Sequence, residues 1–276
     1  MYRYPDKEAA VGVFDSGVGG LTVVREIMRQ TPNEHIVYFG DTARVPYGSK
    51  SKDTVTKYAG QIIRFLETQN VKAIVIACNT ASAYALETVS KEFSLPIIGV
   101  IEPGARVAVE TTRNGKIGVI GTDGTISSGM YSSFIHHLDP EIEVIGISCP
   151  LFVPLVEEGW TKDTITREVA RRYLSSLKDT GIDTLILGCT HYPLLRSLLM
   201  ELMGDSVTLV NPAYETARDL KKLLAERDLE NPGIKTDEKE PYRFFVSDTA
   251  LKFKSFANSI LPYDIETIKK INIEEY

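Results

Sequence analysis

The sequence predicts an α/β protein that consists of two similar α/β domains with mainly parallel sheets. Short apolar runs rich in Val and Ile alternate along the chain with segments of helical periodicity. This alternation is typical of parallel strands that are covered by helices on both faces. A strand, turn and helix pattern near the start of the chain also recurs a little over a hundred residues later. In each half a further apolar run ends in a cysteine, so the two halves are predicted to share one plan.

The order of the elements supports this class. The expected strands are the runs 9–15, 35–40, 72–79, 95–101, 116–122, 143–148, 183–190, 207–211 and 242–248. The expected helices include Lys52–Thr68, Ser82–Phe93, Thr164–Lys178 and Ala213–Arg227. Ligands of such sheets bind at the carboxyl ends of the strands, so the residues after each run are the candidates for a site.

The two halves match segment by segment. Both "VGVFDSGVGGLTVVREIM" and "IGVIGTDGTISSGMYSSFI" read as a strand, a turn of small residues and a helix. Each is followed by a second strand, a long helix and a strand that ends in a cysteine. That cysteine is Cys78 in "KAIVIACNTASA" and Cys189 in "DTLILGCTHYPLL". Two similar units would each bring one cysteine to the carboxyl end of a strand.

Composition and charge exclude several classes of protein. The chain has 276 residues with 31 basic against 37 acidic side chains, so it offers no electrostatic support for a nucleic acid or an anionic membrane. The N-terminus lacks the cationic and apolar segments of a signal peptide, and no window approaches the roughly 20 apolar residues that span a bilayer. We therefore expect a cytoplasmic protein with no nucleic-acid or membrane partner.

The three cysteines do not form a disulfide or structural zinc pattern. They are odd in number and none has CxxC spacing. Cys149 stands in "ISCPLFVPLVEEGW", a stretch interrupted by prolines that we interpret as a loop crossing the core. We interpret this thiol as a buried small hydrophobe.

The stretch "GVFDSGVGGLTV" resembles a phosphate-binding loop but departs from it. It has no Walker A lysine, and Thr22 stands where the third glycine of a dinucleotide fingerprint would follow Gly17 and Gly19. Asp15 would repel a phosphate at the strand end. The glycines alone could serve a tight turn with positive φ and close helix packing. With Asp15 accepting from an ammonium and Ser16 and helix amides donating to a carboxylate, the loop suits an amino acid better than a nucleotide.

The two matched cysteines have a shared setting. Each ends an apolar strand and precedes residues that look like helix N-caps. These are Asn79, Thr80 and Ser82 after Cys78, and Thr190 or His191 after Cys189. A helix N-terminus stabilises a thiolate, so we expect both thiol pKa values to be lowered.

Several chemistries could use these thiols. Two thiols alone fit a redox pair, and Cys78, Cys189 and His191 could bind a metal, although a fourth ligand is not evident. His191 with one cysteine could also form a nucleophilic pair. None of these explains the near-symmetry of the two settings. Two acid/base groups on opposite faces of one substrate carbon explain it, since one thiolate removes a proton and the other thiol returns one.

Seven motifs in matching order resemble the glutamate racemases, cofactor-independent enzymes that make D-glutamate for peptidoglycan. These motifs are "FDSGVGGLTV", "YFGDTARVPYG", "ACNTASA", "VIEPG", "IGTDGTI", "CPLFVPLVEEG" and "LGCTHYPLL". The resemblance runs from about Val11 to Ala217. It weakens near Glu226 to Glu240 and at "LVNPAYETA", where many members have Asp-Ser-Gly and this chain has Asn211, Pro212 and Ala213.

The resemblance implies a fold and a set of catalytic residues. The fold is two α/β domains, pseudo-twofold related, with the active site in the cleft between them. One domain would comprise residues 1–99 plus 212–276 and the other residues 100–211. Cys78 would remove the Cα proton of D-glutamate and Cys189 that of L-glutamate, with Asp15 and His191 assisting.

The resemblance also implies a substrate site. Its residues would be Asp15, Ser16, Tyr47, Gly48, Asn79, Thr80, Thr190, His191, Glu157 and Thr122 or Thr125. From the residues alone, Tyr47 reads as a packed loop aromatic and Glu157 as a solvated helix end. We expect glutamate as the substrate, no cofactor, no metal and a homodimer. Two rival hypotheses are a racemase for aspartate or another amino acid, and a binding or regulatory protein that kept the pocket without catalysis. Retention of both thiols favours catalysis.

Overall fold

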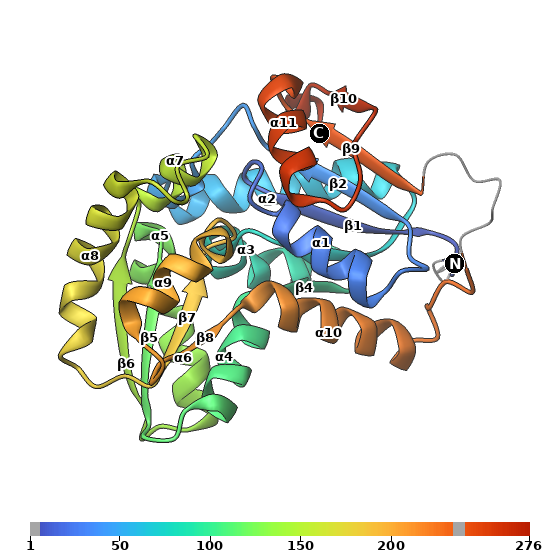
Figure 1. Ribbon diagram of the computed structural model, residues 1–276. Helices are drawn as coiled ribbons and strands as arrows, with labels where there is room; N and C mark the ends of the chain where they lie inside the picture. Colours follow the sequence, from blue (N-terminus) through green and yellow to red (C-terminus); the bar gives the residue numbers. More distant parts are fainter. Residues whose placement is uncertain (1–5, 234–240) are drawn as a thin grey trace.

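Two parallel β-sheets, each covered by helices on both faces, make up the computed structural model, which describes residues 6–233 and 241–276 (Figure 1). The first sheet consists of β1 (Ala10–Asp15), β2 (Ile36–Gly40), β3 (Val71–Ile76), β4 (Ile97–Gly99), β9 (Tyr242–Val246) and β10 (Ile268–Lys270). The second consists of β5 (Lys116–Gly121), β6 (Glu143–Ser148), β7 (Thr184–Gly188) and β8 (Thr208–Val210). All neighbouring strands pair in parallel. The predicted fold class is therefore confirmed.

The duplication predicted from the sequence is visible in the strand order. The first sheet has the order β10-β9-β2-β1-β3-β4 and the second has the order β6-β5-β7-β8. Strands β2-β1-β3-β4 thus have the same connectivity as β6-β5-β7-β8. The chain passes from one sheet to the other after β4 and returns after β8. Equivalent strands β3 and β7 are the ones that lead into Cys78 and Cys189.

The longer helices form the outer layers. They are α1 (Leu21–Gln30), α2 (Lys52–Thr68), α3 (Asn79–Glu92), α4 (Ile101–Thr111), α6 (Met130–Leu138), α8 (Thr164–Lys178), α9 (Arg196–Met203), α10 (Pro212–Glu226) and α11 (Ala250–Ile260). Shorter elements are α5 (Asp123–Ser127), α7 (Phe152–Glu157), η1 (Tyr47–Ser49), η2 (Tyr192–Leu195) and η3 (Ile273–Glu275). None of the helices in the described ranges is long and apolar enough to cross a membrane.

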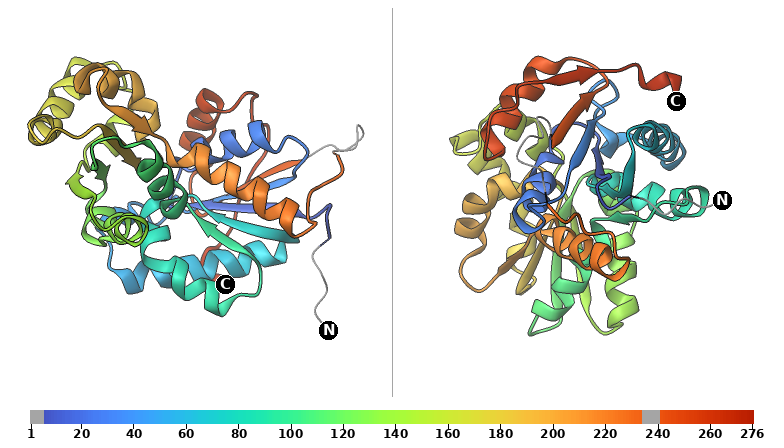
Figure 2. Two further views of the ribbon diagram at one scale, coloured as in Figure 1. Left: turned by 90° about the horizontal axis from the view of Figure 1, so that it is seen from below. Right: turned by 90° about the vertical axis from the view of Figure 1, so that its right-hand side faces the viewer.

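Each sheet is the middle layer of three (Figure 2). Helices α1, α10 and α11 bury apolar side chains against one face of the first sheet, and α2 and α3 cover the other face. Helices α7, α8 and α9 pack on one face of the second sheet, and α4 and α6 pack on the other. Because both faces are covered, the central strands are apolar throughout rather than alternating with polar residues.

Local capping explains where several helices begin. The Ser51 hydroxyl accepts from the backbone N–H of Thr54 at the start of α2, and the Asp163 carboxylate accepts from that of Ile165 at the start of α8. Asn211 caps α10 in the same way, with Pro212 at the first helical position. The Asn-Pro-Ala departure from the family motif therefore forms an ordinary helix start.

The stretch after Cys149 is not the loop that the prolines suggested. Residues Phe152–Glu157 form the short helix α7, in which Pro154 occupies the first turn. A proline is tolerated there because first-turn N–H groups have no partner within the helix. This expectation from the sequence was wrong, and the helix matters because it ends at Glu157.

A buried ion pair closes the amino-terminal end of the first sheet. Lys72 Nζ lies 2.5 Å from Glu34 Oε2 and donates to the backbone carbonyl of Lys7 at 2.6 Å. The other oxygen of Glu34 accepts from the backbone N–H of Asn231 at 2.8 Å. Both charged side chains are almost completely buried. This pair joins four segments at the end of the sheet away from the cysteines.

Replacing Glu34 by glutamine is expected to destabilise the fold without changing the residues around the two cysteines. The change leaves the buried Lys72 ammonium without its counter-charge, which costs about 3 kcal/mol of unfolding free energy. Urea unfolding of the variant and the unmodified protein measures this. A loss of unfolding free energy of about 1 kcal/mol or less, as for an exposed ion pair, would contradict the stabilising role of this buried pair.

Candidate active site

The carboxyl ends of equivalent strands carry the predicted site residues. Asp15 is the last residue of β1, and Cys78 follows β3 by two residues. Cys189 directly follows β7, and Thr122 directly follows β5. A hydrogen bond of 2.9 Å between the hydroxyls of Thr80 and Thr122 joins the two halves at this point. The sequence-predicted residues of both halves are therefore brought together.

The glycine loop approaches the second half closely. A Cβ on Gly19 would lie 2.3 Å from Thr190 Oγ1 and 2.6 Å from His191 Nδ1, and a Cβ on Gly20 would lie 2.5 Å from Asp15 Cβ. Neither of these glycines has a positive φ, nor does Gly17. The sequence suggested two roles for these glycines. The expected close packing is confirmed, and the expected positive φ is wrong.

Asp15 has one carboxylate oxygen available to a ligand. Its Oδ2 accepts from the backbone N–H of Gly17 at 2.9 Å, whereas the buried Oδ1 has no hydrogen-bond partner in the described part of the chain. Burial raises the pKa of this carboxyl, while the charge of His191 and the N–H groups of Gly17 and Gly20 act in the opposite direction. A buried acceptor without a hydrogen bond costs folding free energy. We therefore expect Oδ1 to accept a hydrogen bond from a bound ligand.

Cys78 is itself the N-cap of α3, the place that the sequence assigned to Asn79 and Thr80. Its Sγ accepts from the backbone N–H of Ala81 at 3.5 Å. Burial, and next the negative charge of Asp15, raise the pKa of this thiol to about 12. The lowered pKa expected for Cys78 is therefore wrong, because desolvation outweighs the donors at the helix N-terminus. Cys78 is protonated at neutral pH.

Cys189 is the first member of a chain of three groups. Its Sγ lies 3.7 Å from His191 Nδ1, and His191 Nε2 lies 3.0 Å from Glu157 Oε1. Burial lowers the pKa of His191, but its bonds to Cys189 and Glu157 raise it more, to about 10. The ring of Phe256 from α11 lies 6.2 Å from the imidazole. A protonated His191 therefore donates to the sulfur on one side and to a carboxylate on the other.

Hydroxyl and amide groups of residues after β3 form hydrogen bonds with residues of the second half. The hydroxyl of Thr125 lies 3.2 Å from that of Thr80 and 3.1 Å from that of Thr122, so three hydroxyls converge. The hydroxyl of Tyr131 donates to Asn79 Oδ1 at 2.7 Å, which leaves the amide NH₂ of Asn79 as a donor. Sequence reasoning missed Tyr131, since a tyrosine inside a helix gave no signal of a partner in the other half.

Tyr47 and Gly48 differ in what they contact, since the Tyr47 ring lies in the core of the first half and Gly48 lies against the second half. The ring of Tyr47 is buried and its hydroxyl donates to Asp41. A Cβ on Gly48 would lie 2.7 Å from Thr122 Cβ, so this residue lies directly against the second half. The Tyr47 ring is therefore the packed loop aromatic that its residue type suggested. The backbone N–H groups of the loop could still donate to a ligand.

Cys149 is the buried small hydrophobe expected from the sequence. It is fully buried in the apolar core around α7, α8 and α9, and burial raises the pKa of its thiol to about 12. Its backbone carbonyl accepts from the hydroxyl of Tyr192 at 2.8 Å. No role in the site is needed to explain it.

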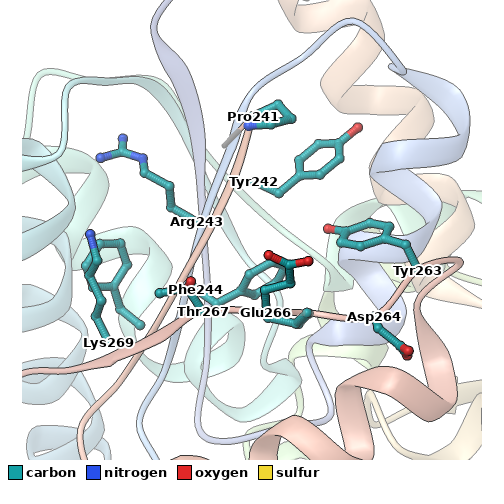
Figure 3. Close-up of a pocket in the computed structure, with 11 residues that line it drawn as sticks. Pro241, Tyr242, Arg243, Phe244, Tyr263, Asp264, Glu266, Thr267 and Lys269 are labelled. Carbon is teal, nitrogen blue, oxygen red and sulfur yellow. The ribbon is translucent and has the colours of Figure 1, made fainter. Parts of the chain in front are cut away.

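Two cavities in the described part of the chain differ in whether site residues line them. A cavity of about 10 Å³ touches Asn79, Cys189 and Thr190. A larger one of about 600 Å³ lies between β9 and the segment 263–267, and neither Cys78 nor Cys189 is among the residues that line it (Figure 3). Across the ranges 6–233 and 241–276, no cluster of three His, Cys, Asp or Glu side chains is placed to hold a metal ion.

Comparison with known proteins decides the family. Residues 11–220 match the family described as Asp/Glu/Hydantoin racemase. The chain belongs to this racemase family. A glutamate racemase from Geobacter metallireducens is 49% identical over 96% of this chain and 97% of its own length.

Solved structures of family members have the same fold. A glutamate racemase isoform from Bacillus anthracis superposes with a TM-score of 0.91 at 41% identity, over 96% of this chain and 98% of the other. The glutamate racemase from Francisella tularensis, solved in complex with D-glutamate, superposes with a TM-score of 0.90 at 40% identity, over 98% and 100%. These racemases therefore share the arrangement of both sheets with this chain.

Proposed function

We propose that this protein is a cofactor-independent glutamate racemase in which Cys78 and Cys189 are the two acid/base groups. One observation carries the proposal: equivalent strands of two equivalent halves bring one buried thiol each to a common site, beside Asp15 on one side and His191 on the other. The glutamate racemases to which the chain is similar support glutamate as the substrate.

The two thiols are prepared for opposite roles in one turnover. From L-glutamate, the Cys189 thiolate takes the Cα proton, and the electron pair left on Cα takes a proton from the Cys78 thiol on the opposite face. Cys189 ends as a thiol and Cys78 as a thiolate, and D-glutamate leaves. Protonated His191 stabilises the Cys189 thiolate by its hydrogen bond, and Glu157 keeps His191 protonated. In the reverse direction Asp15, beside Cys78, assists the other proton transfer.

The surrounding donors match the charges of an amino acid with two carboxylates. The unpartnered oxygen of Asp15 can accept from the substrate ammonium. The hydroxyls of Ser16, Thr80, Thr122, Thr125 and Thr190, the amide of Asn79 and the backbone N–H groups of Tyr47 and Gly48 can donate to the carboxylates. The Cα proton is very weakly acidic, so these donors must stabilise the charge that develops as it leaves, in a site closed to water.

The remaining expectations stay proposals. We propose domain boundaries near Gly99 and Asn211, with the active site in the cleft between the domains. We also propose that the protein is a cytoplasmic homodimer that supplies D-glutamate for peptidoglycan. The first sheet takes its strands from residues 10–99 and 242–270, and the second from residues 116–210, which supports these boundaries.

Incubation with L-glutamate and, separately, L-aspartate in deuterium oxide tests the proposed function. No cofactor is added, and optical rotation and deuterium at Cα are followed. We expect L-glutamate to lose its rotation and take up deuterium. Loss of rotation with aspartate alone would identify the rival racemase, and binding of glutamate without either change would identify a binding protein.

The variant Glu157→Gln is expected to racemise L-glutamate more slowly than the unmodified protein at alkaline pH. The carboxylate of Glu157 raises the pKa of His191. The interaction between the two side chains therefore stabilises the folded protein fully below the ordinary pKa of histidine, and this stabilisation is lost as the pH rises through about 10. Without it the pKa falls, and at about pH 8.5 the rate drops roughly tenfold because His191 loses its proton. A pH–rate profile measures the shift.

The neighbouring Glu158 provides the control for this prediction. Its carboxylate is exposed and accepts from Lys252 at 3.5 Å rather than from His191. Glu158→Gln should leave the profile where it is. An unshifted alkaline limb in Glu157→Gln would show that Glu157 does not set the protonation of His191.

A further inference from the structure

Asp41 is a buried carboxylate for which the proposed chemistry has no use. It directly follows β2 and is fully buried at the carboxyl end of the strand next to β1. Its backbone N–H donates to the carbonyl of Asp15 at 3.1 Å. It therefore lies at the level of the catalytic groups, one strand away from them.

Both carboxylate oxygens of Asp41 accept hydrogen bonds from side chains of this chain. Oδ1 accepts from the hydroxyl of Ser247 at 2.8 Å. Oδ2 accepts from Arg44 Nε at 2.7 Å and from the hydroxyl of Tyr47. Since Arg44 and Tyr47 both belong to the segment that leads to Gly48, Asp41 ties that segment back onto the sheet at two points.

Arg44 extends the anchor to distant parts of the chain. It donates to Gln61 Oε1 in α2 at 2.6 Å and to Glu274 Oε1 in the last turn of the chain at 3.1 Å. Its guanidinium also lies 3.9 Å from the centre of the Tyr58 ring. The segment 41–48 is thereby fixed to α2 and to η3, although it is a loop.

This fixed segment forms one wall of the site. Gly48 lies against Thr122, whose hydroxyl is bonded to that of Thr80, two residues after Cys78. A Cβ on Gly124 would lie 3.0 Å from the Gly48 carbonyl and 3.0 Å from Thr80 Cγ2. Because the Tyr47 hydroxyl donates to Asp41, Tyr47 and Gly48 have only their backbone N–H groups to offer a carboxylate, and the placement of these groups depends on the bonds of Asp41.

We propose that Asp41 is a positioning residue for substrate binding: through Tyr47 and Arg44 it holds the backbone of Tyr47 and Gly48 in place to receive a carboxylate of the substrate. This inference rests on the proposed function. It assigns Asp41 no contact with the substrate and no proton transfer. A loop that holds a carboxylate equally in the ground state and the transition state sets KM more than kcat.

Glu34 is a matched control at the opposite end of the same strand. Both carboxylates are buried and bonded to a cation, but Glu34 precedes β2, and its partner Lys72 is the second residue of β3, the strand whose other end leads to Cys78. A purely structural role for Asp41 would make the two variants behave alike. Both would lose stability, and neither would change KM.

The experiment uses the full chain with Asp41→Ala, Asp41→Asn, Tyr47→Phe, the double variant Asp41→Ala with Tyr47→Phe, and Glu34→Gln. Racemisation of glutamate gives kcat and KM, calorimetry gives the Kd for D-glutamate, and circular dichroism gives the thermal midpoint. We expect KM and Kd to rise about 100-fold in Asp41→Ala, since a small misplacement of a binding group has an effect of this order. Asparagine can still accept from Arg44 and Tyr47, so Asp41→Asn should restore most of the affinity.

Further outcomes separate positioning from stability. Tyr47→Phe should raise KM by roughly tenfold, and the double variant should show less than the product of the two single effects because both changes break one contact. Glu34→Gln should lower the thermal midpoint and leave KM and Kd unchanged. If Asp41→Ala does not fold, the KM and Kd of Tyr47→Phe test the inference, because that variant removes the same hydrogen bond.

The results also separate this inference from the proposed function. Unchanged KM and Kd in folded Asp41→Ala, or in Tyr47→Phe where Asp41→Ala does not fold, would overturn the inference and leave the proposed racemase activity standing. If the unmodified protein binds D-glutamate without racemising it, the proposed racemase activity is wrong, and the inference about Asp41 is then tested by the Kd values alone. If it neither racemises nor binds glutamate, both fail.

Discussion

Replacing Cys78 or Cys189 by alanine is expected to lower racemisation of glutamate in both directions by at least about a thousandfold, because each direction needs one thiolate to take a proton and one thiol to give one. The two thiols are buried at equivalent strand ends, beside Asp15 and His191 respectively. Circular dichroism in both enantiomeric directions measures the rates.

Cys149→Ala is the control for these variants. This thiol is buried in the core of the second half and contacts no proposed substrate group, so its loss should affect stability and leave the rates within error of the unmodified protein. Full activity in Cys78→Ala or in Cys189→Ala would refute the assignment of two bases.

The second large effect is expected from Gly19→Ala. The added Cβ would lie 2.3 Å from Thr190 Oγ1 and 2.5 Å from His191 Cε1, so the glycine loop and the Cys189 side of the site cannot both keep their positions. A displacement of this kind at the chemical groups is expected to reduce kcat/KM about a hundredfold. Steady-state kinetics with L-glutamate measures the loss.

Gly60→Ala is the matched control for the glycine variant. Gly60 lies inside α2, and its added Cβ would meet only the mobile end of the Arg64 side chain, at 3.3 Å. Alanine favours a helix more than glycine does, so this variant should be at least as stable and fully active. Wild-type kinetics in Gly19→Ala would show that the loop does not need to approach His191 so closely.

Much of the fold could be predicted because the signals are local. Helices α2 and α8 have the bounds expected from the sequence, since Ser51 and Asp163 cap them within their own first turn. The doubling of the strand pattern was visible as well, because it depends only on the order of apolar runs. The same order placed Cys78 and Cys189 at equivalent strand ends.

The rest depends on contacts between segments that are distant in the sequence. The raised pKa of Cys78 results from burial in the folded chain and from the charge of Asp15, and neither can be read from the residues next to the thiol in the sequence. The link from Asp41 to Tyr47 is local in sequence, but nothing in "GDTARVPYG" shows that the hydroxyl turns toward this carboxylate. The bond from Tyr131 to Asn79 joins residues in different halves.

The distribution of deuterium after brief reaction of L-glutamate in deuterium oxide tests the central claim most directly. With two thiols on opposite faces, the D-glutamate formed first carries deuterium at Cα, because its proton comes from a solvent-exchanged Cys78, while the remaining L-glutamate keeps its original hydrogen. Mass spectrometry of the separated enantiomers measures both. Protium retained in the first D-glutamate, or deuterium entering L-glutamate as fast as D-glutamate appears, would indicate a single base and contradict the account.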